Sequence, residues 1–174
     1  MARGLLTHVG MRWPALVATC ALAIAGPARA EPLAEVAVRL GSGMASGGGA
    51  GRSTVRAAPV VATVEGAYAF RDQPYVWGFV GLTLETHDRT GVGLEAGVAT
   101  AVGRGGRVRV GLRSIARPYT LHGATVGATW CWPSAPLRGC VDLAGDVYVA
   151  GTDLPPRTAV AQLILAVGTA FDVL

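Results

Sequence analysis

The sequence has 174 residues, of which 51% are apolar, only 15% are charged and 25 are glycine. All 15 basic residues are Arg, and three of them precede residue 31, so the rest of the chain carries 12 Arg against 11 acidic residues and is close to neutral. This balance lacks the strongly basic character on which nucleic-acid binding depends, and we expect no nucleic-acid partner.

The first 30 residues have the features of a secretory signal peptide. Arg3 and Arg12 provide a basic start, residues 13–26 are almost entirely apolar, and Ala28, Arg29 and Ala30 form a small-residue cleavage site. Beyond it, no apolar run reaches the roughly 18 residues that a spanning helix requires. We therefore divide the chain into a signal peptide, residues 1–30, and a single domain, residues 31–174.

The remaining chain breaks into eight segments that are typical of β-strands. In several of them large apolar side chains alternate with small or charged ones, and Gly, Pro and Asp separate the segments. We expect strands at 33–43, 58–70, 75–86, 92–102, 107–117, 121–132, 140–150 and 159–174. The Gly-rich stretch 41–53 is expected to be a flexible loop. The segment 75–86 is apolar on both faces, which leaves its inner face unassigned. The pattern predicts an all-β, eight-stranded antiparallel up-and-down barrel.

The side chains opposite the large apolar ones indicate which face of the barrel is inside. They are Gly, Ala and Thr with a few charges whose signs nearly cancel, which suits a crowded lumen better than a solvated surface. The expected lumen charges are Arg39, Glu65, Glu95, Arg107, Arg109, Arg113, Asp142 and Asp146. Turn positions place Glu95 opposite Arg113 and Arg39 opposite Glu65. The alternative is a soluble periplasmic, lipocalin-like barrel that binds an apolar ligand and carries these charges on its surface.

Aromatic residues indicate how such a barrel would sit in a membrane. With the amino terminus in the periplasm, seven of them fall at the periplasmic ends of the strands, where an interfacial girdle is expected. They are Tyr68, Phe70, Tyr75, Trp77, Trp130, Trp132 and Phe171.

This organisation resembles the small eight-stranded outer-membrane β-barrels of the OmpA/OmpX-like group. The resemblance covers residues 33–174 and lies in the architecture, with no specific motif matched. It implies a transmembrane barrel in the outer membrane that contacts membrane lipid and is inserted by the barrel-insertion machinery. The alternation of Leu163, Leu165, Val167 and Phe171 in the last strand fits this group, whereas the final residue, Leu174, is not the aromatic one that is common there. We expect a monomer.

Two cysteines follow the signal peptide, in a chain bound for an oxidising compartment. Setting Cys131 opposite Cys140 in an antiparallel pair also keeps lumen positions opposite lumen positions, as Thr129 and Asp142 show. We expect a disulfide between them.

Few residues suggest chemistry. His87 and His122 have no neighbours at metal-ligand spacing, and we expect no metal site, cofactor or catalytic residue. A lipid A deacylase would need His, Ser and an acid in register near the outer leaflet. His122 and Ser114 lie towards that end, but no His-x-Ser pattern occurs, and we expect His122 to be a lone histidine. The expected function is non-enzymatic, in envelope integrity or surface contact through extracellular loops. An outer-membrane lipid-modifying enzyme is the second alternative.

Overall fold

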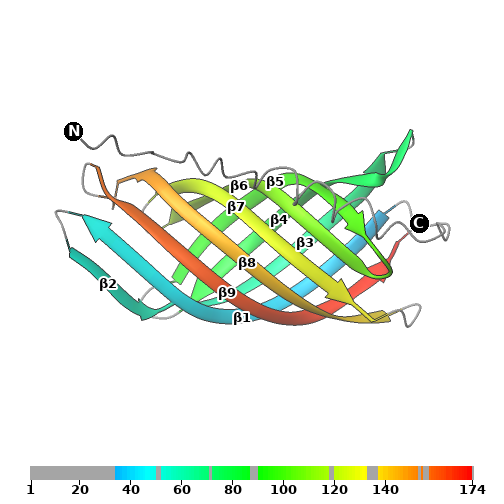
Figure 1. Cartoon of the computed structure of the whole chain (residues 1–174), viewed down its shortest axis with the longest axis horizontal. Helices are drawn as coiled ribbons and strands as arrows, with labels where there is room; N and C mark the ends of the chain where they lie inside the picture. The colour runs from blue at the N-terminus through cyan, green and yellow to red at the C-terminus, as the bar shows by residue number, and fades with distance from the viewer. Residues whose placement is uncertain are drawn as a thin grey trace, which may run out of the picture.

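The computed structural model describes residues 34–49, 52–70, 72–86, 90–117, 120–132, 137–152, 154 and 157–173. The predicted signal peptide, His87 and Leu174 lie outside these residues. The described chain is a single antiparallel sheet that closes on itself (Figure 1). No helix within these residues is long and apolar enough to cross a membrane.

The strands follow one another around the barrel in chain order, apart from the short β2. Their bounds are β1 (Ala34–Gly49), β2 (Arg52–Ala57), β3 (Val60–Phe70), β4 (Gln73–Thr86), β5 (Thr90–Val102), β6 (Gly106–Arg117), β7 (Leu121–Cys131), β8 (Leu137–Gly151) and β9 (Ala159–Asp172). Pairing of β1 with β9, from Glu35 opposite Asp172 to Gly48 opposite Ala159, closes the barrel. Closure leaves no free edge along this seam. The predicted eight-stranded antiparallel barrel is confirmed, with β2 and β3 sharing one position in the ring.

The barrel has two ends, which we name for use below. The disulfide end holds the start of β1, the end of β9 and the β3–β4, β5–β6 and β7–β8 connections. The distal end holds the β1–β2, β4–β5, β6–β7 and β8–β9 connections. Because neighbouring strands are antiparallel, side chains from strands far apart in sequence meet at the same level of the lumen.

The expected loop at 41–53 is wrong. β1 continues to Gly49 and pairs with β9 on one side and with β2 on the other, where Met44 lies opposite Ala57. Glycine serves close approach here, because a Cβ built on Gly43 would lie 1.8 Å from the carbonyl oxygen of Leu163. Gly41 and Gly43 therefore serve the tight β1–β9 seam, and a sequence pattern alone does not distinguish such glycines from those of a loop.

Side chains alternate between the two faces along every long strand. In β3 the pattern of exposure switches at each residue, so that Thr63 and Glu65 are buried while Val64 is half-exposed. Exposed large apolar side chains lie outside on all the strands, among them Val38, Leu82, Leu94, Val110, Leu112, Val126, Leu143 and Leu165. The barrel is thus apolar outside and carries its charges inside.

Candidate functional site

The predicted lumen charges lie inside the barrel. Arg39, Glu65, Glu95, Arg109, Arg113, Asp142 and Asp146 are each no more than 7% exposed, and Arg107 is partly buried. They form three layers along the barrel axis, and each layer joins strands that are not neighbours in the sheet.

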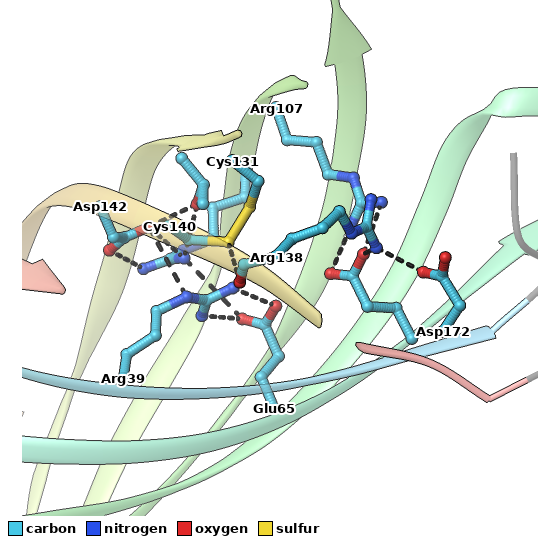
Figure 2. Close-up of a disulfide and its surroundings, with 11 residues drawn as sticks. Arg39, Glu65, Arg107, Cys131, Arg138, Cys140, Asp142 and Asp172 are labelled. Carbon is cyan, nitrogen blue, oxygen red and sulfur yellow. Dashed lines mark hydrogen bonds and ion pairs between the residues drawn. A yellow bond between two sulfur atoms is a disulfide. The ribbon is translucent and has the colours of Figure 1, made fainter. Parts of the chain in front are cut away.

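The layer at the disulfide end is built around Glu35 on β1. Both guanidinium NH groups of Arg107, on β6, donate to its carboxylate at 2.7 and 3.0 Å. Arg138, on β8, bridges Glu35 and Asp172. The Arg107 guanidinium also lies 4.0 Å from the ring centroid of Trp77, within the range of a cation–π contact. Figure 2 shows Arg107, Arg138 and Asp172 beside the disulfide.

Glu35 and Arg138 were missed by the sequence analysis, although a signal for each exists. Glu35 has the same parity on its strand as Arg39, and Arg138 the same parity as Asp142. The predicted strand 140–150 begins too late, because β8 starts at Leu137. Glu35 already lay within the predicted strand 33–43, whereas the seventh predicted strand had to start earlier before Arg138 could be assigned to the lumen.

The middle layer is a four-residue network. Arg39 donates two hydrogen bonds of 2.8 Å to Glu65, and Arg109 donates two of 2.7 and 2.9 Å to Asp142. The two pairs are linked, since Arg109 lies 3.8 Å from Glu65 and Arg39 lies 4.0 Å from Asp142. Thr129 donates to Asp142 from the strand between β6 and β8. Figure 2 shows Arg39, Glu65 and Asp142 pointing toward one another.

The register of the first of these pairs differs from the prediction. Ala37 lies opposite Glu65 and Arg39 opposite Thr63, so that Arg39 and Glu65 are diagonal neighbours. The prediction centred the hairpin near Arg52, but the β1–β3 register centres it one residue earlier. A long Arg side chain reaches a diagonal partner, so the two charges still meet.

The distal layer centres on Arg113. Its guanidinium lies 2.8 Å from Glu95, contacts Asp146, and donates to the Thr83 hydroxyl at 3.4 Å. Glu95 lies directly opposite Arg113 in the β5–β6 register, as the turn position predicts. Arg113 therefore neutralises two buried carboxylates from two different strands.

The described lumen side chains leave little space where they meet. A cavity among Arg39, Arg109, Arg113 and Asp142 has a volume of about 10 Å³, the space of roughly one water molecule. Within the described residues, no group of three or more His, Cys, Asp or Glu side chains is arranged to hold a metal ion. A packed, charged interior is the opposite of the apolar pocket that the soluble, lipocalin-like alternative requires.

Six of the seven predicted girdle aromatics are exposed near the disulfide end. Tyr68, Phe70, Tyr75, Trp130, Trp132 and Phe171 are between 38% and 55% exposed. Trp77 is a correction, because it is completely buried and packs with Ala69, Phe79 and Ala99 inside the barrel. β4 is apolar on both faces, so alternation alone does not show which of its side chains face inward.

The predicted disulfide is confirmed. Cys131 and Cys140 lie opposite each other on β7 and β8 and are bonded. The same register places Thr129 opposite Asp142 and Trp130 opposite Val141. The bond thus ties the two strands at the end of the barrel where Arg138 and Glu35 meet.

The expectation of a lone His122 is wrong. Ser114 on β6 lies directly opposite His122 on β7, and the Ser114 Oγ is 2.8 Å from Nδ1 of His122. Both side chains have the outward parity, and His122 is exposed. Position on neighbouring strands brought together two residues that no linear motif connects.

Comparisons with known proteins identify the fold alone. No protein-family model matches the chain, and no curated protein matches it. The fold is similar to that of Ail, the attachment invasion locus protein of Yersinia pestis, with a TM-score of 0.52 and 12% identity over 79% of this chain and 98% of Ail. A second structure of Ail, in complex with the heparin analogue sucrose octasulfate, gives a TM-score of 0.51 and 11% identity over 79% and 99% of the two chains.

Proposed function

We propose that this protein is an outer-membrane β-barrel that acts by surface contact, and that its distal end binds a polyanionic partner such as a sulfated glycan. The proposed membrane location rests on the different polarity of the outer face and the lumen face of the barrel. Leu94, Val110 and Leu112 are 55–71% exposed at mid-strand, while the charges are buried. An apolar band of this kind around a whole barrel fits lipid, whereas water would favour the reverse arrangement.

The exposed aromatic side chains and the start of β1 support one orientation in the membrane. Exposed Tyr68, Trp130 and Trp132 gather near the disulfide end, and aromatic side chains with a polar edge favour the membrane–water interface. If β1, the amino-terminal strand, starts from the periplasm, the disulfide end faces the periplasm. The distal end would then face the outside.

The charges of the distal end favour an anionic partner. Among the side chains that the structure describes, three exposed arginines lie there, namely Arg56, Arg117 and Arg157. Among the described residues, the exposed acids Asp72 and Asp172 both lie at the disulfide end. Arg157 has a φ of 64°, a conformation that non-glycine residues seldom adopt and that often marks a binding loop.

The similarity to Ail supports this choice of partner. A structure of that barrel holds sucrose octasulfate, which is a densely sulfated analogue of heparin. Arg side chains pair with such groups through charge-assisted hydrogen bonds.

The membrane location is tested by lipid accessibility. Single cysteines at Leu94 and Val110, in a Cys131→Ser/Cys140→Ser background, receive a fluorophore and are reconstituted into vesicles with spin-labelled lipid tails. We expect strong quenching at both sites and little at Thr63, which faces the lumen. Equal quenching at all three positions, or none at the two outer ones, would refute a membrane-spanning barrel.

Polyanion binding is tested by titrating the folded barrel in detergent micelles with sucrose octasulfate. The variant Arg56→Gln/Arg117→Gln/Arg157→Gln should bind more weakly, by about fivefold for each arginine that contacts the ligand, since an exposed charge pair contributes up to about 1 kcal/mol. Binding should also weaken as salt is added. The matched control is Arg104→Gln, an exposed arginine at the disulfide end. Loss of affinity in the control but not in the triple variant would refute the assignment.

A further inference from the structure

We propose that Ser114 and His122 form a nucleophile–base pair on the outer face of the barrel, which cleaves the ester bond of a membrane lipid. The Ser114 Oγ lies 2.8 Å from Nδ1 of His122. With the ring proton on Nε2, Nδ1 accepts a hydrogen bond from the hydroxyl and is placed to take its proton. The proposal goes beyond surface contact, and it rests on the membrane location but not on polyanion binding.

The position of the pair fits a lipid ester. Ser114 lies opposite Leu94 on β5, and Leu112, which has the same outward parity, is 71% exposed. On the distal side, Thr120 and Thr152 hydrogen-bond to each other and join the β6–β7 and β8–β9 connections. The pair therefore lies where the apolar band gives way to polar groups. In a bilayer, this is the level at which fatty acyl chains are joined to their headgroups.

Both flanking strand pairs are irregular at this point. On β6, Ala116 has no partner on β5, because Val92 lies opposite Arg117 and Gly93 opposite Ile115. On β8, Val149 has no partner on β7, because His122 lies opposite Ala150 and Gly123 opposite Tyr148. Bulges of this kind re-aim side chains and recur next to active sites. Two bulges on either side of one Ser–His pair form a second observation, independent of the hydrogen bond.

The reaction is a two-step acyl transfer. The Ser114 Oγ attacks the ester carbonyl carbon while Nδ1 of His122 takes the hydroxyl proton. The bond to the alcohol oxygen then breaks, and this oxygen leaves with the proton from His122. Water next attacks the acyl–serine ester with His122 as base, which releases the fatty acid and restores Ser114. Water is the only co-reactant.

In the first test, the folded wild-type barrel in detergent micelles is labelled with a long-chain alkyl fluorophosphonate. An activated serine oxygen of the protein attacks the phosphorus of this reagent and displaces fluoride. Peptide mass spectrometry should find the adduct on Ser114. Ser42 serves as an internal control, because it is exposed and its hydroxyl donates to a carbonyl, that of Ala58, at 3.2 Å. A Ser114 without an adduct, or labelled no faster than Ser42, would overturn the proposal.

The second test separates an activated serine from a structural hydrogen bond. His122→Gln retains a side chain that can accept a hydrogen bond but not act as the base, so labelling of Ser114 should slow by about 100-fold or more. The heat-dependent gel mobility of the folded barrel should be the same for this variant and for Ser114→Ala. Fatty acid release from phospholipid vesicles should be lost in both variants. Labelling and release that persist in His122→Gln would show that the pair is only structural.

Discussion

Arg113 is the lumen residue whose removal should destabilise the barrel most. It is 3% exposed and neutralises two carboxylates, those of Glu95 and Asp146. Arg113→Met leaves both of them buried without this cation, and breaking a buried ion pair from one side costs about 3–5 kcal/mol. Glu95→Gln leaves Arg113 paired with Asp146, and the loss of one charged hydrogen bond costs about 1.5–3 kcal/mol. We therefore expect Arg113→Met to be the more destabilising of the two.

A triple variant distinguishes lost packing from unpaired charge. Glu95→Gln/Arg113→Met/Asp146→Asn removes the cation together with the two carboxylates that it contacts. We expect it to be more stable than Arg113→Met alone, although it carries more substitutions, because the two anions are no longer left in the lumen.

The free energy of unfolding would be measured by urea titration of the barrel in lipid vesicles, followed by tryptophan fluorescence. Arg104→Met, at an exposed turn position, is the control and should change it by less than about 0.5 kcal/mol. The reasoning is refuted if Arg113→Met and Glu95→Gln are equally stable, or if the triple variant is less stable than Arg113→Met.

Three further predictions use the same unfolding assay. Val110→Arg should destabilise the barrel in membrane by about 2–4 kcal/mol, whereas Val55→Arg on β2, at the distal end, should have little effect. Trp77→Ala should cost about 3–5 kcal/mol, because it empties a fully buried site and removes the contact with the Arg107 guanidinium. An unchanged unfolding midpoint would contradict the burial of Trp77. Cys131→Ser/Cys140→Ser should lose about 2–3 kcal/mol, and the wild-type protein purified without reductant should show no thiol reactive with a maleimide at these positions.

The sequence predicts most where a tight turn fixes the register. The short β5–β6 connection allows few arrangements, and its position alone places Glu95 opposite Arg113. The cysteine pair fixes β7 against β8 in the same way. The glycine-rich connection between β1 and β3 offers no such constraint, and there both the extent of β1 and the register between Arg39 and Glu65 differ from the prediction.

Contacts across the lumen were beyond sequence reasoning for a different reason. Arg107 meets Glu35, and Arg109 meets Asp142, between strands that are not adjacent in the sheet. Such pairs depend on the closure and stagger of the whole barrel and not on any one register. The Ser114–His122 pair could have been found, since it follows from the β6–β7 register, but a search for a linear motif does not consider neighbours across strands.

The glycines of the lumen provide a last test, because a Cβ at such a position would meet the backbone of the neighbouring strand. A Cβ on Gly97 would lie 2.2 Å from the carbonyl oxygen of Val110 and 2.9 Å from the Phe79 ring. Gly66 has the outward parity, and a Cβ there would meet nothing within 4 Å. Gly97→Ala should therefore cost about 1–3 kcal/mol through overpacking, whereas Gly66→Ala should be neutral or slightly stabilising.

The nearest atom to the added Cβ in Gly97→Ala is the backbone carbonyl oxygen of Val110, which cannot move away by a rotamer change as a side chain can. Phe79→Leu should consequently fail to rescue Gly97→Ala, even though it removes part of the ring. Rescue by Phe79→Leu would mean that the aromatic ring, and not the approach of β6 to β5, requires glycine at this position. Equal effects of Gly97→Ala and Gly66→Ala on the unfolding midpoint would show that the lumen has more space at this level than the close approach of β5 and β6 indicates.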